Sequence, residues 1–103
     1  MQLTTFIASL MLASAPAVQA RFFTLYDDIN YGGQPHAENR PDGATCWNLN
    51  GAGDKASSVR GGSGCTTFFQ NRDCQGSSWQ QRGDAPTVPA FLNDHIWSYA
   101  NRC

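Results

Sequence analysis

The sequence predicts a small all-β protein made of two similar halves and stabilised by disulfides. Its strand-like segments are short, are rich in β-branched and aromatic residues, and are separated by Gly, Pro, Asn and Asp. No segment has the periodicity of a long amphipathic helix. All four cysteines lie after the first twenty residues. A domain this small usually needs disulfide cross-links, because its hydrophobic core is limited.

The first twenty residues are predicted to be a cleaved signal peptide. They contain no charged side chain, and an apolar run covers Phe6–Ala13. Short residues at Val18 and Ala20 fit the positions that a signal peptidase reads. A membrane anchor is the alternative, but the apolar run is far shorter than the ~20 residues that a span needs. We expect residues 1–20 to be removed and the mature chain, 21–103, to be secreted and extracellular.

The charge of the chain is close to balanced. Seven Lys and Arg stand against eight Asp and Glu, for a formal net charge of −1. Such a chain has no strong electrostatic attraction for nucleic acid or an anionic membrane. We expect no nucleic-acid partner and no membrane span. The expected state is a monomer, and the expected partner is an extracellular target, either a cell-surface component or a protein, that the sequence does not identify.

Strand-like segments follow one another along the mature chain. The expected strands are, in chain order, Arg21–Asp27, Thr45–Leu49, Ser57–Arg60, Cys65–Asn71, Ser77–Gln81 and Ile96–Asn101. A glycine-rich turn at 61–64 divides them into two groups. Because proline lacks the N–H that a central strand needs, four prolines are expected in connections or at sheet edges. They are Pro35, Pro41, Pro86 and Pro89.

Two spacing patterns recur in the two halves. The pattern aromatic-x-x-x-x-aromatic-x-Gly occurs twice, with cysteine as the second aromatic of the second copy. Its members are Tyr26, Tyr31 and Gly33 in the first half and Phe69, Cys74 and Gly76 in the second. A later pattern, Asp-x-x-x-Ser, ends at Ser58 and at Ser98. Two copies of one Greek-key unit of ~40 residues explain both repeats.

These anchors resemble the signature of the βγ-crystallin family, a double Greek-key sandwich. The resemblance covers essentially all of 21–103 and implies one motif at about 21–60 and a second at about 65–103. Secreted microbial relatives of the fold include killer-toxin-like antifungal proteins and metalloprotease inhibitors. The resemblance therefore implies a protein that acts on something outside the producing cell.

The resemblance also assigns roles to the repeated residues. The aromatic pattern forms a folded hairpin, whose glycine, Gly33 or Gly76, is expected to adopt a positive φ. Ser58 and Ser98 are expected to hydrogen-bond the hairpin of their own motif.

The four cysteines are expected to form two disulfides, because export favours disulfides over free thiols. Four cysteines allow three pairings, and the sequence alone does not choose among them. In the family's topology the last strand of a motif lies beside its first, which implies Cys65–Cys103. The third strand of motif one crosses into the sheet of motif two, which implies Cys46–Cys74.

Calcium is the cofactor that the resemblance raises. Many family members bind two ions through the pattern Asn/Asp–Asn/Asp–x–x–Ser/Thr–Ser, which supplies oxygen ligands. In motif one Gly53 stands at the first position, while Asp54 and Ser57 remain. In motif two Trp97 replaces the hydroxyl ligand, and Arg72 stands at a hairpin position that is often Glu. We expect no cofactor, with at most one weak calcium site at Asp54 and Ser57.

Nothing in the sequence indicates catalysis, so we expect no enzyme and no catalytic residue. His36 and His95 are the only histidines, and neither belongs to a metal-binding or nucleophile-activating motif. The tripeptide Arg82–Gly83–Asp84 is of the integrin-binding type, but three residues recur often by chance. Trp79, flanked by Ser and Gln, is the candidate for an exposed interaction residue.

Three functions fit these expectations. The first is a secreted non-enzymatic toxin, antimicrobial protein or effector directed at a competitor or host, which needs an exposed patch and no metal. The second is a calcium-binding structural or stress protein, which needs an intact site at Asp54 and Ser57. The third is an extracellular protease inhibitor, which needs an exposed rigid loop such as Arg82–Pro89.

Overall fold

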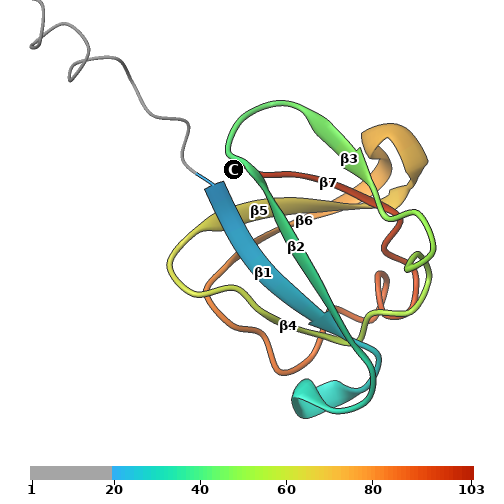
Figure 1. Ribbon diagram of the computed structural model, residues 1–103. Coiled ribbons are helices and arrows are strands. Elements are labelled where there is room, and N and C mark those ends of the chain that lie inside the picture. The colour runs from blue at the N-terminus through green and yellow to red at the C-terminus, as the bar shows by residue number, and fades with distance from the viewer. Residues whose placement is uncertain (1–19) are drawn as a thin grey trace, which may run out of the picture.

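The computed structural model describes residues 20–103, so the predicted signal peptide lies outside the described part except for its last residue. Within this part of the chain, seven strands and two 3₁₀ turns build two antiparallel sheets that pack face to face (Figure 1). The elements are β1 (Ala20–Tyr26), η1 (Ile29–Tyr31), β2 (Pro35–Pro41), β3 (Cys46–Asn48), β4 (Ser58–Arg60), β5 (Cys65–Asn71), η2 (Arg72–Cys74), β6 (Gln75–Arg82) and β7 (Ser98–Ala100). No helix in the described part is long and apolar enough to cross a membrane.

Each motif contributes a segment to the sheet of the other motif, a strand from motif one and an isolated bridge from motif two. Sheet A has the order β2-β1-β4, and sheet B has the order β3-β7-β5-β6. β3 belongs to motif one, yet it pairs with β7 of motif two (Figure 1). In return, a bridge joins Ala85 of motif two to Val59 on β4. This exchange is the double Greek key, and it confirms the predicted all-β fold class.

A folded hairpin joins the first two strands of each motif. Both hairpin glycines have a positive φ, 77° at Gly33 and 84° at Gly76. A Cβ on Gly33 would also lie 2.8 Å from a carboxylate oxygen of Asp28. Glycine is therefore needed at Gly33 both for its backbone conformation and for the close approach of a neighbour.

One buried serine holds each hairpin against its sheet. The Ser58 hydroxyl donates a hydrogen bond to the Asp28 carbonyl at 2.6 Å and accepts one from the Tyr31 N–H at 3.0 Å. Ser98 makes the same two bonds in motif two, at 2.5 and 2.8 Å, with the hairpin groups at the equivalent positions. Both serines are fully buried, so these bonds also satisfy backbone groups that water does not reach.

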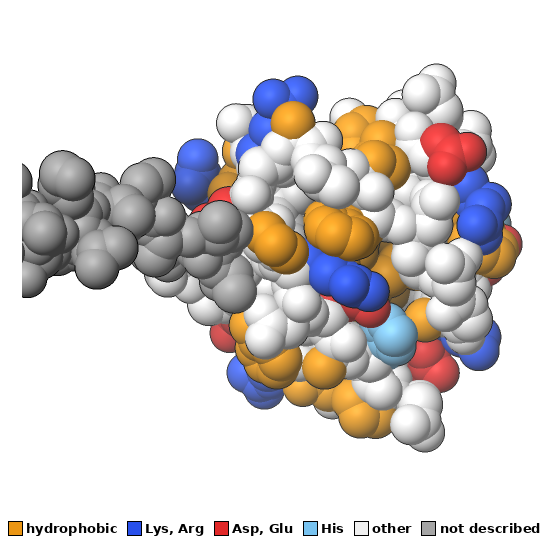
Figure 2. Space-filling model, turned by 45° about the horizontal axis from the view of Figure 1, so that its top comes forward, with side chains coloured by type: hydrophobic (Ala, Val, Ile, Leu, Met, Phe, Trp, Pro, Cys, Tyr) orange, Lys and Arg blue, Asp and Glu red, His pale blue; other side chains and the backbone are white. Residues whose placement is uncertain are grey.

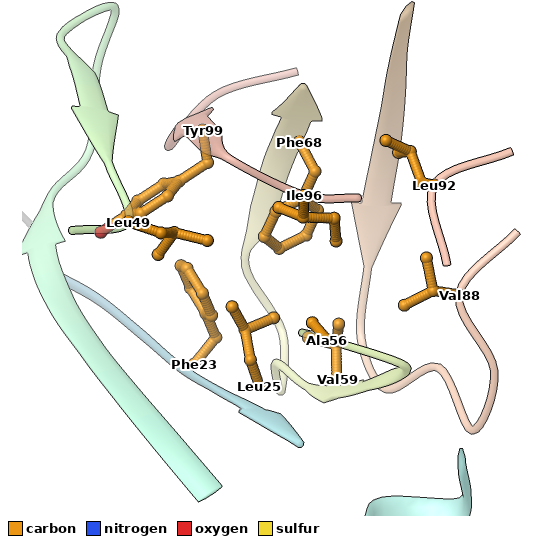
Figure 3. Close-up of a cluster of buried hydrophobic side chains, with 10 residues drawn as sticks. All are labelled: Phe23, Leu25, Leu49, Ala56, Val59, Phe68, Val88, Leu92, Ile96 and Tyr99. Atoms are coloured by element: carbon orange, nitrogen blue, oxygen red, sulfur yellow. The ribbon is translucent and has the colours of Figure 1, made fainter. Parts of the chain in front are cut away.

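The hydrophobic core lies between the two sheets and draws on both motifs (Figure 3). The ring of Phe23 on β1 packs edge-to-face on two rings from sheet B. Its centroid lies 5.4 Å from that of Phe68 and 4.9 Å from that of Tyr99. The remaining members are Leu25, Leu49, Ala56, Val59, Val88, Leu92 and Ile96. Alternation along β5, with Thr66 and Phe68 facing inward, produces this layer.

The glycine-rich turn at 61–64 wraps a buried arginine. Arg21 is 5% exposed, and its guanidinium donates to the Thr66 hydroxyl at 3.0 Å and to the Gly61 carbonyl. A Cβ on Gly61 would lie 2.8 Å from an Arg21 nitrogen, and one on Gly64 would also clash with this side chain. Burial lowers the pKa of Arg21, although an arginine remains charged. The turn is rich in glycine because a guanidinium occupies the space beside it.

β2 is a strand that the sequence pattern does not indicate. Its residues, Pro35–Pro41, are mostly polar or proline and lack β-branched side chains, and the pattern predicts no strand there, with the two prolines in a connection or at a sheet edge. In the structure all seven residues pair with β1. β2 is the edge strand of sheet A, so most of its side chains face solvent and no hydrophobic alternation is required. Its two prolines stand at the strand ends, where a missing N–H matters least.

The serine that ties the first hairpin is expected to contribute measurably to stability. Ser58→Ala removes one donor and one acceptor and leaves two hairpin backbone groups without partners, so it should lower the free energy of unfolding by about 2 kcal/mol. Urea unfolding of the oxidised mature chain measures this difference. The matched control is Ser78→Ala on exposed β6, which should change it by less than about 0.5 kcal/mol. Equal effects of the two variants would contradict the role given to Ser58.

Candidate functional site

The segments 53–58 and 93–98 lie side by side where the two motifs meet. The Asp54 N–H donates to the Ile96 carbonyl and the Asp94 N–H donates to the Ala56 carbonyl, both at 3.0 Å. Both aspartates have a left-handed backbone, with φ of 61° at Asp54 and 63° at Asp94. The two loops are therefore copies of one conformation, paired by reciprocal hydrogen bonds.

A large side chain of one loop fills the space beside a glycine of the other. A Cβ built on Gly53 would overlap the ring of Trp97. Gly53 is buried, and Trp97 is partly buried against it. A side chain at Gly53 and the indole of Trp97 would therefore compete for one volume. The two positions that depart from the repeated pattern are therefore in contact with each other.

A guanidinium lies next to this interlocked pair. The Arg72 carbon Cζ lies 5.5 Å from the centroid of the Trp97 ring, within the range of a cation–π contact. Arg72 also donates a hydrogen bond from Nη2 to Oδ1 of Asn50 at 3.0 Å. Beside it, the amide of Asn48 makes two hydrogen bonds with Asp73, at 3.0 and 2.8 Å. The second hairpin thus brings a positive charge of the protein itself to the loop of motif one.

Solved structures of βγ-crystallin domains are similar to this chain. A βγ-crystallin domain from Clostridium beijerinckii shares 28% identity with a TM-score of 0.65, covering 80% of this chain and 95% of that one. One from Flavobacterium johnsoniae shares 25% identity with a TM-score of 0.59, covering 76% and 90%. A βγ-crystallin from Ciona intestinalis shares 23% identity and supports the fold alone, with a TM-score of 0.65 and coverage of 79% and 99%. No protein-family model and no curated protein sequence matches the chain.

The chain has the βγ-crystallin fold.

In this βγ-crystallin-like chain the loop of motif one does not fit a calcium ion well. Calcium takes six to eight oxygen ligands. Here the first ligand position is Gly53, whose missing side chain is replaced by the ring of Trp97. Arg72 adds a positive charge beside the same ring, and two cations at short range repel each other. Among residues 20–103 there is no group of three or more His, Cys, Asp and Glu side chains arranged to hold a metal.

Asp54 and Ser57, the weak calcium site that the sequence suggests, make separate side-chain contacts in the structure. The Ser57 hydroxyl donates to Oδ1 of Asp94, in the other motif, at 3.0 Å. The Asp54 carboxylate instead lies 3.9 Å from Nδ1 of His95 and is about half exposed. Ser57 and Asp94 are therefore two oxygen-bearing side chains that the structure brings together. The sequence signal for that pair was the repeat itself, since the two loops occupy equivalent positions.

Trp79, the candidate interaction residue, is not fully exposed. It is partly buried, and its ring stacks on that of Phe68 with centroids 5.7 Å apart and planes at 29°. This contact places one face of the indole against the core. Its role in binding a partner stays a prediction that concerns the outer face of the ring alone.

The segment Arg82–Pro89 is bound to the rest of the protein along much of its length. The Asp84 carboxylate accepts hydrogen bonds from the N–H groups of Gly61 and Gly62, at 2.8 and 3.2 Å. These bonds hold the pKa of Asp84 below its usual value. Ala85 then pairs with β4. The Arg-Gly-Asp tripeptide therefore serves as a turn anchor, and the segment lacks the free backbone of an inhibitor loop.

A charged cluster that sequence reasoning missed lies on β2. Glu38 accepts a hydrogen bond from the hydroxyl of buried Tyr99, and Nε2 of His36 lies 2.5 Å from its other oxygen. Burial, together with the hydrogen bond to Glu38, raises the pKa of Tyr99. Arg40 lies 4.0 Å from Glu38, and its Cζ stands 4.6 Å from the ring of Trp47. Figure 2 shows a histidine, an acidic and a basic side chain gathered beside hydrophobic ones in this way. The cluster joins the edges of the two sheets.

The interlock of Gly53 and Trp97 is expected to appear as a large coupling energy. Gly53→Ala should destabilise the fold by about 2–3 kcal/mol, because the new methyl group overlaps the indole. In a Trp97→Ala background the same change should cost less than about 1 kcal/mol, since the ring is gone. Urea unfolding of the four proteins measures both. Gly32→Ala is the control, because its Cβ would meet only ordinary contacts at 3.4 and 3.5 Å. A penalty at Gly53 that persisted without the ring would contradict the interlock.

Proposed function

We propose that the mature chain, 21–103, is a secreted non-enzymatic toxin, antimicrobial protein or effector that binds a target outside the producing cell. The observation that carries this proposal is the filled loop of motif one. Gly53, Trp97 and Arg72 occupy the place where the family resemblance implies an ion. A domain without that ion keeps its fold in media of any calcium content, which suits a protein that acts at a distance from its source.

The two disulfides support an extracellular role. Cys46–Cys74 ties the crossing strand β3 to the second hairpin, and Cys65–Cys103 ties the start of β5 to the chain end. These are the pairs that the resemblance implied. They close segments of 28 and 38 residues, and the chain-entropy estimate gives each about 3–4 kcal/mol of stabilisation. Disulfides of this kind persist in oxidising compartments outside the cytosol.

A calcium-binding structural domain is the second candidate, and one observation favours it. The βγ-crystallin fold is that of small structural or calcium-binding domains, and the hydroxyl of Ser57 lies 3.0 Å from the carboxylate of Asp94. Both are oxygen ligands of the type that calcium takes. Two oxygens are far fewer than a full coordination shell, so we place this function second.

Thermal unfolding with calcium and then with a chelator separates the two functions. We expect the unfolding midpoint of the oxidised chain to be unchanged by calcium. An ion that bound at a hundredfold excess over its dissociation constant would add about 2.7 kcal/mol. In a domain of this size that gain would raise the midpoint by roughly 10 °C or more. A rise of this size in wild type that is lost in Asp94→Asn would contradict the proposal that the domain works without calcium.

The toxin or effector role itself is tested on cells. Purified oxidised mature chain would be added to bacteria, fungi and cultured host cells, with and without a chelator. We expect growth arrest or death in at least one of these classes, unaffected by the chelator and abolished by reduction and alkylation of the four cysteines. The absence of any effect on all three classes would contradict the proposal.

A further inference from the structure

The two motifs can be compared residue by residue on the outer faces of their sheets. In sheet A, Thr24 on β1 pairs with Arg60 on β4. In sheet B, Thr67 on β5 pairs with Ala100 on β7 in the same register. Arg60 and Ala100 therefore occupy equivalent places, one in each motif.

In motif one this face is filled by a stack of side chains. The ring of Tyr31, from the hairpin, packs edge-to-face on Tyr26 with centroids 5.9 Å apart. The guanidinium of Arg60 covers the same ring, with Cζ only 3.8 Å from its centroid. One phenol ring is thus held between an aromatic side chain of the sheet and an arginine.

Motif two keeps the aromatic side chain of the sheet but lacks the ring and the arginine that cover it in motif one. Phe69 stands at the place of Tyr26, whereas Cys74 replaces the Tyr31 ring and Ala100 replaces Arg60. A hollow of about 440 Å³ opens there. Its lining includes Phe69, Cys74, Ala100, Thr67, Gln80 and Arg102. The volume lies in the range of ligand sites in proteins, about 300–1,000 Å³.

Both disulfides stand at the walls of this hollow. Cys74, bonded to Cys46, and Cys103, bonded to Cys65, both belong to the lining. The Thr67 hydroxyl also donates to the Arg102 carbonyl at 2.7 Å, which holds the chain end against the sheet. Walls that are fixed before binding lose little conformational entropy when a ligand enters. Arg102, an exposed residue of the lining, is the arginine nearest to hand in a motif that lacks the equivalent of Arg60.

We propose that this hollow binds a tyrosine side chain of a partner protein. The ring would take the place that Tyr31 has in motif one, on Phe69 and beside the guanidinium of Arg102, where a cation–π contact forms. The exposed amide of Gln80 can hydrogen-bond the phenol. The choice of a partner protein as the source of the ring rests on the proposed extracellular binding function, while the preference for a phenol ring rests on the comparison of the two motifs.

An NMR titration of the oxidised mature chain tests the site directly. The probe is N-acetyltyrosine amide, and N-acetylleucine amide controls for apolar contact without a ring. We expect saturable amide shifts around the hollow with the tyrosine probe, with a dissociation constant of about 1–10 mM for a single side chain. The leucine probe should give none. No saturable shift with the tyrosine probe, or equal shifts with both, would overturn the proposal.

Two variants and one control locate the binding. Ala100→Arg installs the residue of motif one and should abolish the shifts by filling the hollow, while Arg102→Gln should weaken binding about threefold. Arg82→Gln, an exposed arginine on β6 outside the lining, should leave binding unchanged. Should Ala100→Arg fail to fold, Arg102→Gln still decides. Binding that Arg102→Gln leaves unchanged, or that Arg82→Gln weakens equally, would overturn the assignment.

Free p-cresol distinguishes a small phenol from a tyrosine in a chain. We expect p-cresol to bind more weakly than the tyrosine probe, because it lacks the flanking amides. If it bound at least as tightly, the proposal that the ring comes from a partner protein would be wrong. If the variants lost tyrosine binding but still killed cells, the proposal for the hollow would be wrong and the proposed function would be unaffected. Binding without any effect on cells would instead contradict the toxin role alone.

Discussion

The hydrogen bonds from Ser58 and Ser98 to the two hairpins are the constraint on which the rest of the structure depends. Each serine fixes the hairpin that follows the first strand of its motif. In motif two that hairpin carries Arg72 to the loop of motif one and Cys74 to within bonding distance of Cys46. The filled loop and one wall of the hollow therefore both follow from the position of one hairpin.

Sequence reasoning recovered the parts of the fold that depend on spacing. The repeated Gly33 and Gly76 and the repeated serines stand at backbone positions that local chemistry constrains. Such positions can be predicted from the sequence alone. The strand β2 was not predicted, because an exposed edge strand needs no hydrophobic alternation and Pro35–Pro41 has none. Its pairing is decided by β1, which the hairpin brings alongside, and long-range pairing of this kind leaves little local signal.

The side-chain arrangement of the candidate site could not be predicted from the sequence, because it depends on contacts between the two motifs. Gly53 and Trp97 each looked like a separate loss of a ligand type. Their overlap becomes visible only when the two loops are paired, since they are 44 positions apart in the chain. In the same way the hydrogen bond of the Ser57 hydroxyl goes to Asp94, which lies in the other motif. Repeats predict which positions are equivalent, whereas side-chain volume decides what those positions do.

The two motifs solve one packing problem differently, and the difference has a physical cost. Motif one covers the outer face of its sheet with Tyr31 and Arg60, which contribute contact area and a cation–π interaction. Motif two replaces the tyrosine with Cys74, which gives up that area but gains a covalent link to Cys46. A disulfide acts mainly on the unfolded chain, so it restores stability without refilling the surface. The face of motif two can therefore stay hollow in a stable domain, which leaves room for the proposed ligand.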